Sequence, residues 1–207
     1  MSPTFHRFYQ RHLVRGKFAN EERPVLLNSW EAAFFDFDEE KLLGQAKRAA
    51  AAGIELFVLD DGWFGRRDDD TSSLGDWYVD KRKLPGGLAR LEEGVHRLGM
   101  GFGLWVEPEM VSQDSDLYRQ HPDYVLHTQG RPYTYGRSQL VLDLSRREVC
   151  QRVLEDMTRV LGLARIDYVK WDMNRQLTDV GSSSLPPERQ GEVYHRYMLG
   201  LYWIMEQ

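Results

Sequence analysis

The sequence predicts an α/β fold made of parallel strands and helices. Short apolar runs alternate along the chain with segments of helical spacing, a pattern typical of βα units whose sheet is covered by helices. Polar and aromatic side chains follow each run, and the sites of (β/α)8 barrels gather at this end of the strands. No glycine-rich phosphate loop follows any run, which argues against a dinucleotide-binding sheet. A partial (β/α)8 barrel is therefore the predicted fold class.

The first two βα units are predicted between residues 25 and 99. Residues 25–30 form a short apolar strand, and Asp38 is a suitable N-cap for the helix that follows and ends at Gly53. Residues 54–60 are nearly continuously apolar, as in a buried strand. The next helix ends at Gly99, and its inner face is predicted to carry Leu88, Leu91, Val95 and Leu98.

Two further units are predicted around an irregular insertion. Residues 102–106 form the third strand, and residues 110–144 do not fit a βα unit, so they are predicted as an excursion with a strand-like run near its end. Ser145 and Glu148 have the spacing of a capping box at the start of the third helix. The fourth strand covers residues 168–172, and a fourth helix should run from about Arg189 to the end.

These units give a domain division. Residues 1–24 are predicted as an N-terminal lead-in, and residues 25–207 as the first half of the barrel, because a complete eight-unit barrel needs about 250 residues. We expect the remaining units to lie beyond Gln207. The first and fourth strands would then have open edges, which predicts self-association of the chain.

Composition narrows the possible partners. The net charge of −5 gives no basic field for nucleic acid or for a membrane surface, so we expect neither as a partner. The six histidines show no ligand spacing, and the acidic run Asp68–Asp70 is predicted as a solvated loop, so no metal site is predicted. The N-terminus has no apolar signal region, which favours a cytoplasmic protein.

Reactive side chains concentrate in and just after the fourth strand. Alternate residues of a strand share a face, so Lys170, Asp172 and Asn174 should point together. A lysine beside a carboxylate lowers the carboxylate's pKa, which suits a nucleophile. An ordinary surface ion pair at a strand end would give the same local pattern.

A wider set of motifs favours the nucleophile. In sequence order, the chain resembles the catalytic barrel of family 36 α-galactosidases in five segments: Asn28–Ala32, Leu59–Gly65, Asp69–Trp77, Gly103–Met110 and Lys170–Asn174. The resemblance implies that Asp172 is the nucleophile of a retaining hydrolase acting on α-galactoside oligosaccharides without a cofactor. It further implies a galactose site, to which Asn174 is added because it shares a strand face with Asp172: Trp30, Asp60, Asp61, Trp105, Arg137, Lys170 and Asn174.

Retaining hydrolysis needs two carboxyl groups about 5–5.5 Å apart, and only one of the pair is recognised here. In the family the acid/base aspartate follows a later strand, so we expect it beyond Gln207 and expect the chain alone to be inactive. Glu107 and Glu109 are interpreted as groups that fix loops. Three alternatives stay open: a galactosyl-transferring relative, an N-acetylgalactosaminidase relative, and a sugar-binding module without catalysis.

Overall fold

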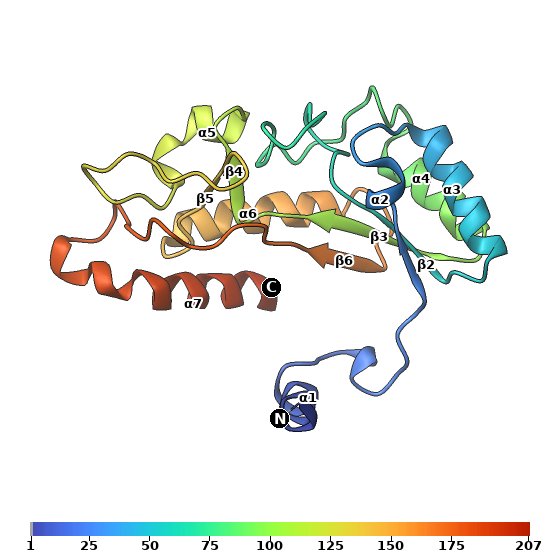
Figure 1. Ribbon diagram of the computed structural model, residues 1–207, viewed down its shortest axis with the longest axis horizontal. Coiled ribbons are helices and arrows are strands. Elements are labelled where there is room, and N and C mark those ends of the chain that lie inside the picture. Colours follow the sequence, from blue (N-terminus) through green and yellow to red (C-terminus); the bar gives the residue numbers. More distant parts are fainter. Residues whose placement is uncertain (1) are drawn as a thin grey trace.

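A parallel sheet forms the centre of the computed structural model, which describes residues 2–207 (Figure 1). Its strands are paired in the order β1 (Leu26–Asn28), β2 (Leu56–Leu59), β3 (Gly101–Val106) and β6 (Tyr168–Trp171). All three pairings are parallel. The order in the sheet follows the order in the chain, and β1 and β6 are its edges. The predicted α/β class with a parallel sheet is confirmed.

The middle strands are buried on both faces. Every residue of β2 is buried, as is every residue of β3 after Gly101. Gly103 pairs with Val58 and Tyr168, and a Cβ at this position would lie 2.9 Å from Val58 Cγ2. A side chain here would press on the side chains of Val58 and Tyr168, so the glycine leaves room for both on this face of the sheet.

Helices follow the strands as predicted. The helices α3 (Glu39–Ala51) and α4 (Gly87–Arg97) pack against each other, and α6 (Arg147–Leu161) packs against α7 (Val193–Glu206). Asp38 caps α3 by accepting a hydrogen bond from the Lys41 N–H at 2.8 Å. Short helices lie at α2 (Trp30–Ala33) and η3 (Pro187–Glu192).

The predicted capping box at the start of α6 is wrong. Arg146 occupies the N-cap position and makes no capping bond with its side chain. The Ser145 hydroxyl instead donates to Asp143 Oδ1 at 2.5 Å, and the Ser145 N–H also bonds this oxygen. Asp143 is fully buried and needs donors, so it takes the serine that the local pattern assigned to the helix.

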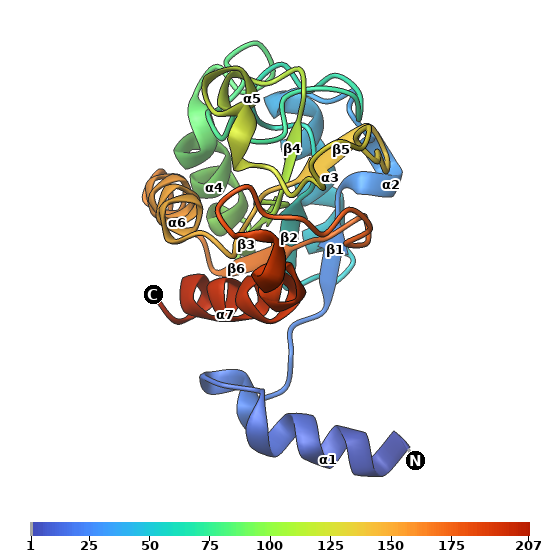
Figure 2. The ribbon, with the colours of Figure 1, turned by 90° about the vertical axis from the view of Figure 1, so that its left-hand side faces the viewer.

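The predicted excursion forms a small layer beyond the C-terminal end of β3 (Figure 2). It contains β4 (Met110–Ser112), α5 (Asp116–Gln120), η2 (Pro122–Tyr124) and β5 (Gln139–Val141), and β4 pairs antiparallel with β5. Both strands are buried. The excursion thus places side chains above the edge of the sheet where the polar residues gather.

The N-terminal segment stands apart from the sheet (Figures 1 and 2). It consists of α1 (Ser2–His12) and η1 (Lys17–Ala19), and no residue of α1 is buried. Phe5 and Phe8 are each about half exposed. Nowhere in residues 2–207 is there a helix with the length and apolar character needed to cross a membrane.

Candidate active site

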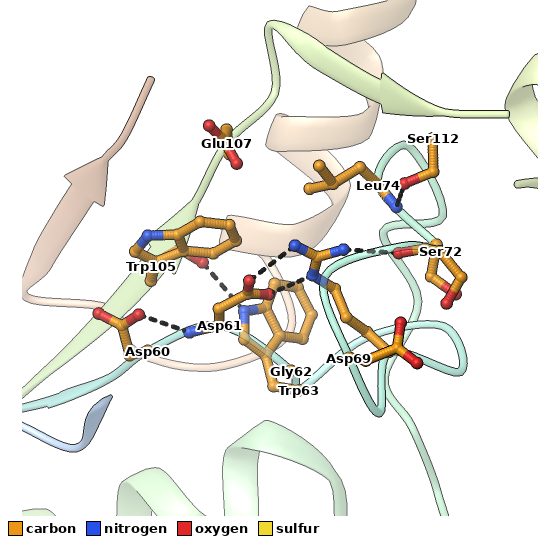
Figure 3. A network of polar contacts seen from close by, with 12 residues as sticks. Asp60, Asp61, Gly62, Trp63, Asp69, Ser72, Leu74, Trp105, Glu107 and Ser112 are labelled. Atoms are coloured by element: carbon orange, nitrogen blue, oxygen red, sulfur yellow. Dashed lines mark hydrogen bonds and ion pairs between the residues drawn. The ribbon is translucent and has the colours of Figure 1, made fainter. Parts of the chain in front are cut away.

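Polar and aromatic side chains meet at the C-terminal ends of all four parallel strands. Asn28 ends β1, Asp60 follows β2, Trp105 lies near the end of β3, and Asp172 follows β6. The strands are parallel, so their C-terminal ends lie on the same side of the sheet. Figure 3 shows Asp60, Asp61 and Trp105 on that side.

Asp172 is held by three donors and is half-buried. Trp105 Nε1 donates to its Oδ2 at 3.0 Å, and Asn174 Nδ2 donates to the same oxygen at 2.9 Å. The Met173 N–H donates to Oδ1 at 3.1 Å. Burial alone would raise the pKa of Asp172, but these bonds and the charge of Lys170 hold the pKa below its usual value. The group is thus an ionised, oriented carboxylate that solvent can still reach.

Asp60 connects the first, second and fourth strands of the sheet. Its Oδ2 accepts from Asn28 Nδ2 at 2.5 Å and from Lys170 Nζ at 2.9 Å. Its Oδ1 accepts from the Asp61 N–H at 2.9 Å. The Lys170 ammonium group is thus bonded to Asp60, and its charge also lowers the pKa of Asp172.

Asp61 forms a buried, bidentate ion pair that the sequence interpretation did not foresee. Arg67 Nε and Nη2 donate to its two oxygens at 2.6 and 2.8 Å, and Arg67 is fully buried. The rings of Phe35 and Phe64 lie 5.7 and 5.8 Å from the guanidinium carbon. Burial raises the pKa of Asp61, and Arg67 opposes this rise. Figure 3 shows the carboxylate turned toward the guanidinium group.

The side chains of two predicted sugar-binding residues form no hydrogen bond with this cluster in the part of the chain that the structure describes. Trp30 is half-buried at the start of α2, and its ring meets Phe34 and Phe35 edge to face. Arg137 is exposed on the excursion, in the left-handed region at φ 51°. Within residues 2–207, no hydrogen bond joins Arg137 to the other predicted site residues.

A buried arginine positions the part of the excursion next to Arg137. Arg175 Nη1 donates to the carbonyl oxygens of Thr134 and Gln139 at 2.9 and 2.6 Å. A Cβ added at Gly136 would lie 3.2 Å from Arg175 Cβ. Arg175 was not among the predicted site residues, because an arginine after a strand carries no pattern that marks it as buried.

Two buried glutamates bond to residues in and just after β6. Glu107 is fully buried, and its Oε1 accepts from the Asn174 N–H at 2.5 Å. Burial raises the pKa of Glu107 to about 7, although the bonds from Asn174 oppose the rise. Glu109 accepts from Trp171 Nε1 at 2.9 Å and from the Tyr197 hydroxyl. Both carboxylates fix segments around β6, in line with their interpretation from sequence.

The acidic run after the aspartate pair is engaged by its neighbours. Asp68 forms ion pairs with Arg82 at 3.0 Å and with Lys83 at 3.2 Å. Asp69 accepts from the N–H and the hydroxyl of Thr71. These contacts fit the interpretation as a surface loop.

Known proteins with this architecture are numerous. The Melibiase family profile matches residues 1–207. The chain is 60% identical over its whole length to α-galactosidase AgaA of Geobacillus stearothermophilus, and 54% identical to α-galactosidase 1 of Pediococcus pentosaceus. It spans 28% of the length of each of these relatives.

Solved structures agree with the sequence matches. A crystal structure of the GH36 α-galactosidase AgaA from Geobacillus stearothermophilus in complex with raffinose superposes with a TM-score of 0.95 at 60% identity. That match covers 100% of this chain and 29% of the crystallised one. The α-galactosidase from Lactobacillus brevis gives a TM-score of 0.92 at 55% identity, over 96% and 27% of the two chains. The chain therefore belongs to the Melibiase family, the α-galactosidases of glycoside hydrolase family 36.

Proposed function

We propose that the protein containing this chain is a retaining α-galactosidase, which hydrolyses terminal α-galactosides through a galactosyl-enzyme intermediate on Asp172. The observation that carries the proposal is the environment of this residue. Its carboxylate has a lowered pKa, stays half-exposed, and is oriented by Trp105 and Asn174. A nucleophile needs these three properties: charge, access and a fixed direction.

The two oxygens of Asp172 have different hydrogen-bond partners, and we assign them different roles. Oδ2 receives both side-chain donors, whereas Oδ1 receives only the Met173 N–H. Oδ1 is the freer oxygen, and we assign it the attack on the anomeric carbon. The bonds to Oδ2 stabilise the carboxylate as a leaving group when water later cleaves the glycosyl ester.

The acid/base residue is proposed to lie in a part of the protein outside this chain. Glu107 is connected to Asp172 through Asn174, but it is fully buried and has no exposed surface on which to meet a glycosidic oxygen. The Asp60 carboxylate is occupied by Asn28, Lys170 and the Asp61 N–H. Without a second carboxyl group the chain alone should not turn over α-galactosides.

Galactose recognition is assigned to the groups around Asp172. Asp60 and Lys170 form one polar wall that offers acceptors and donors to sugar hydroxyls, and Trp30 and Trp105 supply apolar ring surface. Asp61, Arg137 and Asn174 complete the proposed set. Structures of the relative AgaA in complex with raffinose and with stachyose support α-galactoside oligosaccharides as ligands.

The proposal also covers the fold of the chain and its division into segments. We propose that residues 25–207 form the first half of a (β/α)8 barrel, with an excursion at 110–144 and a lead-in at 1–24. The support is the set of parallel strands paired in chain order, with functional side chains at their C-terminal ends.

A direct experiment uses the protein produced from the complete reading frame around this chain. It should hydrolyse p-nitrophenyl α-galactoside and not the matching α-glucoside, and the first sugar product seen by proton NMR should be α-galactose. Initial formation of β-galactose would refute the retaining mechanism. Absence of α-galactoside hydrolysis would refute the proposed function.

A further inference from the structure

The Asn174 main chain is held in an unusual way. The parallel pairing of β3 with β6 ends at Val106 and Trp171, and the Asp172 N–H still donates to the Val106 carbonyl at 2.8 Å. The next N–H on that side of the chain, at Asn174, donates to the Glu107 side chain. A carboxylate thus takes the place of a main-chain carbonyl where the ladder stops.

This contact sets the position of the Asn174 amide. Asn174 lies outside any strand or helix, so no regular hydrogen bonding fixes its backbone. Its side chain nevertheless reaches Asp172 Oδ2 at 2.9 Å, while its N–H is bound to Glu107 at 2.5 Å. Losing the second bond would free the residue that provides the first.

The other Glu107 oxygen faces a second buried group. Gln139 Nε2 donates to Glu107 Oε2 at 3.2 Å, and Gln139 Oε1 is buried without a partner within residues 2–207. An amide can present either end to a carboxyl group: its N–H₂ to the ionised form, or, when turned over, its oxygen to the protonated form. Gln139 can therefore serve Glu107 in both protonation states.

We propose that Glu107 is a positioning residue of the nucleophile, which anchors the Asn174 main chain so that the Asn174 amide stays directed at Asp172. The inference rests on the proposed role of Asp172. It gives Glu107 no contact with substrate and no proton transfer to it. The required property is an acceptor oxygen toward the Asn174 N–H, and both the acid and its carboxylate have one.

Four single variants in the protein from the complete reading frame test this assignment: Glu107→Ala, Glu107→Gln, Asn174→Ala and Glu109→Gln. The glutamine at 107 keeps the acceptor oxygen and removes the ionisable group. Glu109 is the matched control, because it is also a buried carboxylate and bonds Trp171 and Tyr197 rather than Asn174.

With p-nitrophenyl α-galactoside, Glu107→Ala and Asn174→Ala should each lower kcat by roughly tenfold or more with a smaller change in KM. Adding Glu107→Ala to Asn174→Ala should cost little more, because in this proposal the loss of the Glu107 contact acts only through the bond of the Asn174 amide to Asp172. Glu107→Gln should retain kcat within about threefold of wild type. Multiplicative losses in the double variant would overturn the proposal, and so would a loss in Glu107→Gln as large as that in Glu107→Ala.

The pKa of Asp172 gives a readout that does not depend on hydrolysis. Carbon-13 NMR of labelled aspartate, assigned with Asp172→Asn, should show a higher Asp172 pKa in Glu107→Ala and in Asn174→Ala, and an unchanged value in Glu107→Gln and Glu109→Gln. An unchanged value in Glu107→Ala would refute the positioning role even in a fully active enzyme. If the wild-type protein does not hydrolyse α-galactosides but Glu107→Ala still raises the pKa of Asp172, the proposed function alone is refuted. If Glu107→Ala does not fold, Glu107→Gln decides: a raised Asp172 pKa there overturns the proposal, and an unchanged one supports it.

Discussion

Lys170 Nζ lies 2.9 Å from Asp60 Oδ2, although 110 residues separate the two in the chain. Their strands, β6 and β2, are not neighbours, because β3 lies between them. The ion pair therefore bridges over β3, next to Trp105, and joins the galactose-binding candidates to the strand that precedes Asp172. A substitution of Asp60 should therefore affect both galactose binding and the position of Lys170 near Asp172.

Asp60→Asn should lower kcat/KM for an aryl α-galactoside by about tenfold or more, because it weakens a charged acceptor for sugar hydroxyls. Binding of glucose should change much less, since glucose lacks the axial 4-hydroxyl. Calorimetric titration of the variant with both sugars checks the ratio. Equal losses for galactose and glucose would indicate that Asp60 is structural only.

Asp172→Ala should abolish formation of the glycosyl-enzyme, lowering kcat by about 10⁴-fold or more. Added azide should restore part of the turnover, because the small anion fits where the carboxylate was. The product is then β-galactosyl azide, which NMR identifies. Unchanged activity in this variant would end the assignment of the nucleophile.

Asp61→Asn should destabilise the chain by about 3–5 kcal/mol, because it leaves the buried Arg67 guanidinium without its counter-charge. Urea unfolding of the 207-residue chain measures this free energy. Lys41→Ala is the matched control, since the ion pair of Lys41 with Asp36 is solvent-exposed at a similar distance of 2.8 Å. Equal midpoints for Asp61→Asn and Lys41→Ala would contradict a stabilising role for the buried pair.

Glu107 should make the stability of the fold depend on pH. Its pKa is raised from 4.5 to about 7 on folding, so the folded chain binds more protons in that interval and loses stability as pH rises through it. Above pH 7 the loss is complete and amounts to roughly 3 kcal/mol. The difference in unfolding free energy between Glu107→Gln and wild type should grow in favour of the variant from pH 4.5 to pH 7. A difference that is flat with pH would contradict the raised pKa.

The isolated chain should self-associate. The strands β1 and β6 are edges of the sheet, and α7 exposes Met198, Leu199, Tyr202 and Met205. Sedimentation velocity should show species larger than a monomer. Leu199→Lys combined with Tyr202→Lys should shift the distribution toward the monomer, whereas a wild-type chain that stays monomeric at high concentration would refute the expectation.

The fold and the candidate site were predictable from sequence to different degrees. Apolar runs and helical spacing identified the parallel strands and their helices, because burial on both faces leaves a strong pattern in β2 and β3. The start of α6 was mispredicted, since Ser145 bonds the buried Asp143 two residues before it and does not cap the helix. The capping pattern does not show that Asp143 is buried and competes for the serine.

At the site, motif order identified the residues around Asp172, but their connections needed coordinates. Arg67 directly precedes the acidic run Asp68–Asp70, which is predicted as a solvated loop, yet it is fully buried against Asp61. Glu107 was interpreted as fixing a loop, and only the bond from the Asn174 N–H shows which loop. A charged residue in a sequence does not reveal whether its side chain will be buried in the fold.

The agreement between strand order and chain order has a consequence for biosynthesis. After β1, each strand that emerges from the ribosome finds a neighbour already made, so the sheet can grow from the N-terminal side one strand at a time. Within residues 2–207, β1 is the one strand of this sheet that waits for a partner encoded after it, namely β2. The strand β6, which precedes Asp172, is the last of the four to be synthesised. Asn28, Asp60 and Trp105 can therefore already be in place when Asp172 joins them.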